Sequence, residues 1–264
     1  MLRAERTLRS RLAARHAVVA TFVMVPRVEV LEMLAVAGYE AVIIDLEHGP
    51  IGVSELPALA AFAKAAGIQS IARVGELRAS TIASVLDAGF DGVMVPHISS
   101  AAAAAACVQA ARFPPDGHRS LNPYVRGAAY DATTPDRLAG FDGHAALIGM
   151  LEGRDGIEDL DAILATPGLD GVFVGPIDLS GDLGHPGQPE HPAVVAAVRE
   201  IFARCAEAGV ASGVYAPTPE RANDWFERGA SLVAVSADAA MMLDGFRAIR
   251  DRVKPPVGGG GPTR

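Results

Sequence analysis

AGFDGVMVP, residues 88–96, decides the fold, because it joins the end of one predicted element to the start of the next. A glycine follows an alanine- and leucine-containing helical pattern, and a short apolar run begins three residues later. The same form recurs as AGYEAV at 37–42, PGLDGV at 167–172 and, less closely, RGASLV at 228–233. Glycine at each joint suits a helix C-cap, where the left-handed backbone favours a residue without a side chain. The stretch therefore predicts a helix followed by a strand, repeated along the chain.

Apolar strand patterns and Ala/Leu-rich helical patterns alternate outward from this stretch. Strands that are apolar without alternation are buried on both faces, which is typical of a parallel sheet. The predicted strands span 17–24, 41–45, 68–73, 92–96, 146–151, 171–174, 210–215 and 232–236. The predicted helices span 27–37, 53–66, 78–88, 99–112, 155–165, 191–208, 218–228 and 238–251.

Eight strand–helix units in roughly 250 residues indicate an α/β fold of the (β/α)8 TIM-barrel type, in a single domain. An open doubly wound sheet is the alternative, but no glycine-rich phosphate fingerprint follows the first strand. We expect the barrel to occupy residues 1–252 and the tail VKPPVGGGGPTR, 253–264, to be disordered. The long polar segment 113–145 interrupts the alternation and is interpreted as a functional loop that shapes the acceptor pocket.

Composition narrows the class of protein. The formal net charge of −8 argues against nucleic acid and anionic membranes as partners, since both require a basic face. The apolar run 17–25 is too short to span a membrane. The two cysteines, Cys107 and Cys205, lie in helical patterns and are interpreted as small buried thiols of a cytoplasmic protein.

Charged and polar residues follow strand after strand. In a TIM barrel the chemistry lies at the C-terminal ends of the strands, so these residues are expected to share one rim. They are Asp45, Glu47 and His48, then Arg73, Pro96-His97, Glu152, Gly175 to Asp178, Tyr215, and finally Ser236 and Asp238.

Glu152 and Asp178 end neighbouring predicted strands. Two carboxylates completed by substrate oxygens and water suit a hard divalent cation, Mg²⁺ or Mn²⁺, with Co²⁺ as a third candidate. The alternative is a pair of salt bridges, with Arg154 available to Glu152. His185 and His191 flank the proline-rich HPGQPEHP, which favours a loop over a zinc site.

His48 stands after a strand end and near Asp45 and Glu47. Carboxylate neighbours raise the basicity of an imidazole and fix its tautomer, as a general base requires, although a buried core histidine is the alternative. Arg73 ends a buried strand, where an unpaired guanidinium is costly. A bound carboxylate or a structural acid must therefore meet it.

The only lysines, Lys64 and Lys254, lie in a predicted helix and in the tail. Schiff-base chemistry requires a lysine at a strand end, so a covalent imine is not expected. No glycine-rich phosphate loop follows the last strand, which disfavours phosphorylated substrates. No organic cofactor is expected.

At this point the sequence resembles the HpcH/HpaI aldolase family, the metal-dependent class II pyruvate aldolases. The resemblance extends over the second to sixth predicted strands in the same order. IDxEH and GPxDLS are its most specific motifs. The matching stretches are IIDLEHGP, IARV, VLDAGFDGVMVP, RFPPDGHRS, GMLEGRDGIEDLDAIL and GLDGVFVGPIDLSGDLGHPGQPEHPAV.

The resemblance implies a role for each matching residue. His48 looks like the general base, Asp87 like an acid that raises its basicity, and Arg73 like the group that stabilises charge on the keto acid. The remaining implied roles are metal binding by Glu152 and Asp178 and substrate contact by Arg73, Asp178, Met150 and the Ile177 amide. Two positions depart from the family pattern: Met150 replaces a frequent glutamine, and Ile177 replaces a small residue.

Asp87 precedes a strand, so it should lie at the opposite end of its own barrel from His48. A neighbouring subunit is therefore expected to supply it. The resemblance implies a homo-oligomer, typically a hexamer.

The expected function is reversible cleavage of a 4-hydroxy-2-oxo acid to pyruvate, or a related 2-oxo acid, and an aldehyde, through an enolate that the metal and Arg73 stabilise. His48 transfers the proton, supported by Asp45 or Asp87, with Glu47 as a further supporting group. One alternative is a citrate-lyase-β-like enzyme that cleaves malyl- or citramalyl-CoA. Another is a non-catalytic barrel that binds a keto acid or a metal as a sensor or scaffold.

Overall fold

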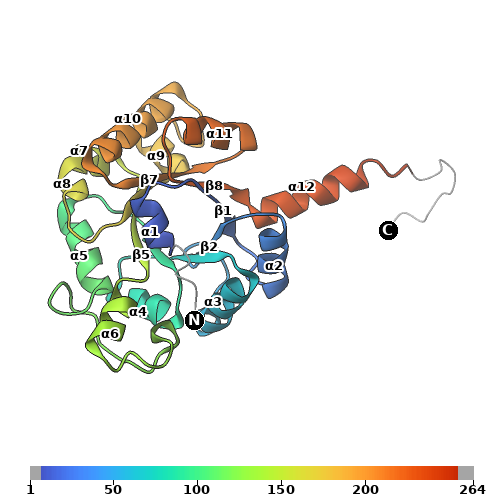
Figure 1. The fold of residues 1–264 in the computed structure, drawn as a ribbon. Helices are drawn as coiled ribbons and strands as arrows, with labels where there is room; N and C mark the ends of the chain where they lie inside the picture. Colours follow the sequence, from blue (N-terminus) through green and yellow to red (C-terminus); the bar gives the residue numbers. More distant parts are fainter. Residues whose placement is uncertain (1–6, 255–264) are drawn as a thin grey trace.

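The computed structural model describes residues 7–254. Its eight strands form one closed barrel in the order β1 to β8, and each strand pairs in parallel with its neighbours (Figure 1). Every strand lies within one residue of its predicted bounds. The strands are β1 (Val18–Val23), β2 (Ala41–Asp45), β3 (Gln69–Arg73), β4 (Gly92–Val95), β5 (Ala146–Leu151), β6 (Gly171–Val174), β7 (Ala211–Ala216) and β8 (Leu232–Ala237).

The helices that follow the strands also agree with prediction, with two divisions. The predicted helix 53–66 is a short 3-10 helix followed by an α-helix, and the predicted helix 155–165 is two short helices that meet at Asp159. These elements are α2 (Val28–Val36), η1 (Val53–Glu55), α3 (Leu56–Ala66), α4 (Ala79–Ala88), α5 (Ala101–Ala111), α7 (Arg154–Glu158), α8 (Leu160–Leu164), α10 (Pro192–Ala208), α11 (Pro219–Glu227) and α12 (Asp238–Arg250). Four further elements were not predicted: α1 (Leu8–Ala13), η2 (Arg126–Ala128), α6 (Pro135–Asp142) and α9 (Pro176–Asp182).

The four glycine joints are built as predicted. Gly38, Gly89, Gly168 and Gly229 have φ angles of 91°, 88°, 91° and 91°. A side chain is strained in this left-handed region, so glycine lets the chain leave each helix and enter the next strand. The repeated sequence form is therefore a repeated backbone turn.

The strands separate two cores. Their outward side chains pack against the helices in one large cluster, whereas inward side chains such as Ile43, Ile71, Met150 and Phe173 fill the barrel. Since successive side chains of a strand point to opposite faces, every second residue belongs to the interior. This alternation determines which residues reach the rim.

Helix α1 lies over the middle of the strand ring in Figure 1. Its Leu8 and Leu12 are 0% and 1% exposed and belong to the interior core. A side chain at Gly92, the first residue of β4, would come within 3.0 Å of Leu8 Cδ2. The helix therefore closes the N-terminal end of the barrel, and the catalytic rim is expected at the other end.

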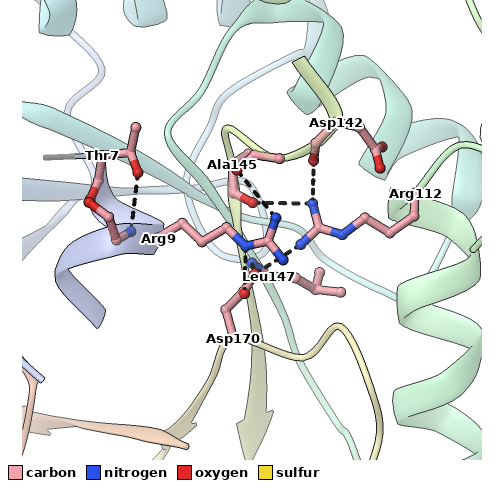
Figure 2. A network of polar contacts seen from close by, with 9 residues as sticks. Thr7, Arg9, Arg112, Asp142, Ala145, Leu147 and Asp170 are labelled. Carbon is pink, nitrogen blue, oxygen red and sulfur yellow. Dashed lines mark hydrogen bonds and ion pairs between the residues drawn. The ribbon is translucent and has the colours of Figure 1, made fainter. Parts of the chain in front are cut away.

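Segment 113–145 joins the end of α5 to the start of β5, so it lies at the N-terminal end of the barrel. The expectation that it shapes this chain's own acceptor pocket is wrong, because that pocket would lie at the opposite end. The segment has a small core of Phe113, Ala128, Ala132 and Phe141. Figure 2 shows the polar network beside it, in which Arg112 and Arg9 both bind Asp170 at the start of β6.

Helix α12 projects from the barrel (Figure 1). Leu243, Phe246 and Ile249 are 46%, 66% and 67% exposed along it. The tail predicted to be disordered lies outside the described residues except for Val253 and Lys254. Between residues 7 and 254, no helix combines the length and apolar character that a membrane crossing requires.

Candidate active site

The rim residues are the top layer of the barrel interior. Ile43, Ile71 and Met150 point inward, and the residue two positions later on each strand or just past it is Asp45, Arg73 or Glu152. The period of two therefore carries these charged side chains into the mouth of the barrel. The sequence prediction that they gather at one rim is confirmed.

Asp45 and Arg73 are paired residues on neighbouring strands. Arg73 Nε and Nη2 donate to the two carboxylate oxygens of Asp45 at 2.9 and 2.6 Å. Asp45 is 0% exposed and Arg73 is 8% exposed. Burial opposes the charged form of Arg73, but attraction from Asp45, Glu47 and Glu152 outweighs it and raises the arginine pKa. The structural acid that the sequence required for Arg73 is therefore Asp45.

Asp45 does not contact the imidazole of His48. Its Oδ1 instead accepts the backbone amides of Glu47 and His48 at 3.0 and 3.4 Å. A side chain at Gly49 would come within 2.2 Å of the Asp45 carbonyl oxygen, so the turn requires glycine there. Asp45 thus orders the turn that carries His48 and fixes Arg73, rather than supporting the imidazole directly.

Glu47 lies between one guanidinium and two imidazoles. Its Oε2 is 3.3 Å from Arg73 Nη1, and its Oε1 is 3.8 Å from His48 Nε2 and 3.6 Å from His97 Nε2. Among residues 7–254, Oε2 has no hydrogen-bond donor although it is buried. A buried carboxylate oxygen needs such a donor. A bound hydroxyl group or water can supply it.

His48 is accessible, with 63% of its side chain exposed. This excludes the alternative of a core histidine. The Glu47 carboxylate faces its ring at 3.8 Å, which is longer than a hydrogen bond. A substrate group can therefore approach the ring from solvent.

Sequence reasoning placed His97 on the rim but gave it no role. Its backbone amide and its Nδ1 both contact Glu152 Oε1, at 2.8 and 2.7 Å. The backbone of His97 has φ of 56°, the left-handed conformation that brings both groups to one oxygen. The only sequence signal was its position directly after the strand that ends in Pro96.

Glu152 is 7% exposed and Asp178 is exposed on the first turn of α9. Arg154, the expected salt-bridge partner of Glu152, contacts Asp182 instead. Burial raises the pKa of Glu152, contact with His97 opposes the rise, and the charges of Asp178 and Glu47 add to it. Carboxylates that repel one another in a buried mouth favour a cation between them.

The residues present fit a hard divalent cation. Glu152 and Asp178 offer oxygen ligands, and a side chain at Gly175 would come within 3.1 Å of Glu152 Oε2. Glycine thus keeps the backbone clear beside that oxygen. Among the described residues no group of three or more His, Cys, Asp or Glu could hold a metal ion. A cation here would therefore complete its shell with substrate and water oxygens.

Met150 lies near Glu152 inside the barrel, and Ile177 precedes Asp178 on α9. Met150 is 3% exposed in the interior core, and its Cε would lie 2.7 Å from a side chain at Gly175. Ile177 is 51% exposed on α9. Met150 offers no hydrogen bond beside the two carboxylates, and Ile177 adds an apolar surface.

Three other sequence candidates have other partners; one of them, Asp238, directly follows β8 and so lies on the predicted rim. Asp238 accepts the amides of Met24 and Val25, so it ties β1 to the start of α12. The rings of His185 and His191 stack with centroids 3.4 Å apart in the loop between α9 and α10.

Asp87 lies near the C-terminal end of α4 and binds Arg119 of segment 113–145 at 2.5 Å. It is therefore at the N-terminal end of the barrel, as the sequence predicts, and not beside His48 of its own chain.

The chain resembles known proteins over most of its length. The family model described as HpcH/HpaI aldolase/citrate lyase matches residues 19–244. A relative, the 5-keto-4-deoxy-D-glucarate aldolase of Klebsiella pneumoniae, is 36% identical over 224 residues, which cover 84% of this chain and 87% of the relative.

Solved structures agree. An HpcH/HpaI aldolase/citrate lyase family protein from Burkholderia cenocepacia has a TM-score of 0.87 and 32% identity, covering 93% of this chain and 98% of its own. The citrate synthase SbnG has a TM-score of 0.85 and 29% identity, covering 94% and 97%. With a family match across nearly the whole barrel and relatives named as aldolases, the chain belongs to the HpcH/HpaI aldolase/citrate lyase family of carbon–carbon lyases.

Proposed function

We propose that the chain is a class II aldolase that uses Mg²⁺ or Mn²⁺, with Co²⁺ as a third candidate. It reversibly cleaves 4-hydroxy-2-oxo acids to pyruvate, or a related 2-oxo acid, and an aldehyde. The observation that carries the proposal is the convergence of Glu47, Glu152, Asp178, His48 and the buried Arg73 at one mouth of the barrel. This set combines a cation-binding pair, a base and an anion-stabilising group.

Glu152 and Asp178 would hold the cation, which when bound supplies a Lewis acid at the keto oxygen of the substrate. Arg73 keeps Nε and Nη2 on Asp45 and directs Nη1 toward the site. A guanidinium fixed in this way needs no reorganisation as negative charge develops on the keto acid. Arg73 therefore stabilises that charge.

His48 is the proton-transfer group. In cleavage it takes the 4-hydroxyl proton, directly or through a water, while the C3–C4 bond breaks and its electron pair moves into the enolate of the 2-oxo acid. In the reverse direction a base removes the methyl proton, the enolate carbon adds to the aldehyde carbon, and the resulting 4-alkoxide takes its proton from protonated His48, directly or through a water. The exposure of His48 allows either partner to reach its ring.

The named relatives support the substrate class. 5-Keto-4-deoxy-D-glucarate carries, counted from its keto end, a 2-oxo group, a methylene and a hydroxyl on the fourth carbon. It is therefore itself a 4-hydroxy-2-oxo acid. We include it among the candidate substrates of this chain, with Met150 and Ile177 as substrate contacts that adjust the choice.

We further propose that the enzyme is a homo-oligomer, with a hexamer favoured, in which a neighbouring copy brings Asp87 to His48. The exposed apolar residues of α12 support assembly, because single chains rarely expose a row of large apolar side chains without a partner. The partners are otherwise small molecules. Cytoplasmic location stays a prediction; Cys107 and Cys205 are free and buried.

The test is a metal-supplemented screen of 4-hydroxy-2-oxo acids that follows release of the 2-oxo acid. 5-Keto-4-deoxy-D-glucarate is included, and malyl-CoA and citramalyl-CoA represent the alternative lyase. We expect release from at least one oxo acid and none from the thioesters. Cleavage of a thioester alone would overturn the proposal.

His48→Ala should in addition suppress exchange of the pyruvate methyl protons with solvent. Retention of the wild-type exchange rate would remove His48 from the role of base. The relatives' names as aldolases weigh against the remaining alternative of an inert binding barrel.

A further inference from the structure

Two arginines of segment 113–145, Arg119 and Arg137, form ion pairs, and Arg119 is the more deeply buried of the two. Its side chain is 2% exposed, and its Nη2 donates to Asp87 Oδ1 at 2.5 Å. The Asp87 side chain is 34% exposed. One partner of this pair is therefore fixed in the interior, and the other reaches the surface.

Two phenyl rings hold the guanidinium in place. Arg119 Cζ lies 4.7 Å from the centroid of Phe113 and 4.5 Å from that of Phe141, both in the segment core. Stacking on aromatic faces stabilises a cation and fixes the plane of a guanidinium. Its orientation is thus determined before any partner approaches Asp87.

Asp87 is the anion that this buried cation requires. Burial lowers the pKa of Arg119, and the hydrogen bond and charge of Asp87 oppose that shift. Arg119 Nε is buried without a hydrogen-bond partner among the described residues, so Asp87 supplies the main compensation. The ion pair therefore fixes the position of the Asp87 carboxylate through its Oδ1.

The backbone around Asp87 is held as well. A side chain at Gly127, in η2, would come within 2.2 Å of the Leu86 carbonyl oxygen and 3.4 Å of the Asp87 carbonyl oxygen. The segment therefore packs directly on the last turn of α4. In the hydrogen bonds of residues 7–254, Arg119 engages Oδ1 of Asp87, and no second donor engages Oδ2.

We propose that Arg119 is a positioning residue for the aldol reaction, which holds Asp87 through Oδ1 and leaves Oδ2 to receive His48 of a neighbouring copy. The inference rests on the proposed function, because it takes from it the pairing of Asp87 with His48. Segment 113–145 lies at the opposite end of the barrel from the active site of its own chain. The proposal gives it a function at the active site of the neighbouring copy. An imidazole gains basicity only from a carboxylate that is ionised and correctly aimed.

The first test uses hybrids of two inactive variants, co-expressed with different tags and purified through both. Arg119→Met and His48→Ala should each lose at least about tenfold in kcat/KM as homo-oligomers, a typical cost of losing general-base support. In a hybrid, His48 of the Arg119→Met copy meets an intact Asp87–Arg119 pair of its neighbour. The hybrid should regain up to about half of wild-type activity, because one of the two reciprocal sites is complete.

The matched control is a hybrid of His48→Ala with Arg73→Leu. His48 and Arg73 serve the same mouth, so no site in this hybrid is complete and it should stay inactive. Absence of recovery in the Arg119→Met hybrid, or recovery in the control, contradicts the proposal.

A second test separates positioning from general stability. In an Asp87→Asn background, Arg119→Met should change kcat/KM less than twofold, because an effect transmitted through Asp87 is already lost. An additive loss indicates a merely structural role and overturns the proposal. Arg119→Lys keeps the charge and provides a milder variant should Arg119→Met fail to fold; it should recover part of the activity.

Arg112 provides the matched control for burial. Its side chain is 6% exposed in the same region, but it binds Asp170 and backbone carbonyls rather than Asp87 (Figure 2). Arg112→Met should lower the thermal unfolding temperature and leave kcat within twofold of wild type. Arg9→Met, which perturbs the same network from a more exposed position, is the milder form of this control.

The outcomes distinguish the inference from the function on which it rests. A wild-type protein without retro-aldol activity contradicts the proposed function itself. A different result concerns Arg119 alone. If the wild type is active and the hybrid of His48→Ala with Asp87→Asn regains activity, but the hybrid of His48→Ala with Arg119→Met does not, only the role of Arg119 is contradicted.

Discussion

The guanidinium of Arg73 donates two hydrogen bonds to the carboxylate of Asp45 inside the mouth of the barrel. The two residues are register partners on β3 and β2, so the sheet itself determines their separation. The Arg73 guanidinium also lies 4.9 Å from the centroid of the Phe22 ring. Three strands thus hold the Arg73 guanidinium at the mouth of the barrel.

Asp45→Asn should therefore destabilise the fold and abolish activity together. It removes the charge that compensates a buried guanidinium, which typically costs about 3–5 kcal/mol in the free energy of unfolding. Urea denaturation measures the loss. The exposed pair Glu76 and Arg78 is the control, since Glu76→Gln should cost less than about 1 kcal/mol. Equal effects at the two sites would contradict a buried, functional pair.

His97→Ala should weaken cation binding without removing a carboxylate. It deletes the Nδ1 contact that orients Glu152 Oε1, and such supporting partners typically contribute about 10–100-fold to metal affinity. Titration with Mn²⁺, followed by electron paramagnetic resonance, gives the dissociation constant. Unchanged affinity would show that Glu152 is oriented without the His97 side chain.

Gly175→Ala should reduce cation affinity and activity through a steric effect. The new methyl group would meet Met150 Cε at 2.7 Å and Glu152 Oε2 at 3.1 Å. The double variant Gly175→Ala, Met150→Ala should recover part of the affinity, because one of the two contacts is relieved. If the double variant binds Mn²⁺ no better than Gly175→Ala, a steric contact between Met150 and the new methyl group is not the cause of the weaker binding.

As the pH is lowered, cation binding should begin to weaken at a higher pH than it would with an ordinary glutamate as ligand. Burial and the nearby Asp178 and Glu47 raise the pKa of Glu152, so protons compete with the cation already above the usual glutamate range. In the metal-free protein the pH dependence has the opposite direction: the free energy of unfolding decreases as the pH rises through the raised pKa of Glu152. Glu152→Gln should remove this loss. Mn²⁺ titrations and thermal unfolding across pH 5–8 test both directions.

The fold was largely readable because it rests on local signals. Glycine turns and apolar runs recur in sequence, so each strand was predicted to within one residue. Helix α1 was missed because Leu8 and Leu12 are buried by a long-range contact with the barrel interior, and the segment is otherwise arginine-rich. Helix α9 was missed because its short sequence, beginning at Pro176, reads as a loop.

The sequence indicates which charged residues form the site, but not which of them contact one another. The period of two places Asp45, Arg73 and Glu152 on the rim, yet it does not say which charge meets which. Asp45 was expected beside the His48 ring and instead binds Arg73, because strand register decides the contact. His97 contacts Glu152 because its backbone is in the left-handed conformation, which no pattern in the sequence predicts.

The most direct test of the central claim follows release of pyruvate, or of the related 2-oxo acid, from the best 4-hydroxy-2-oxo acid of the screen before and after exhaustive chelation, with metal content measured by emission spectroscopy. We predict that activity disappears with the metal and returns when Mg²⁺ or Mn²⁺ is added to wild type, but not to Glu152→Gln. Full activity in protein of negligible metal content would contradict the account.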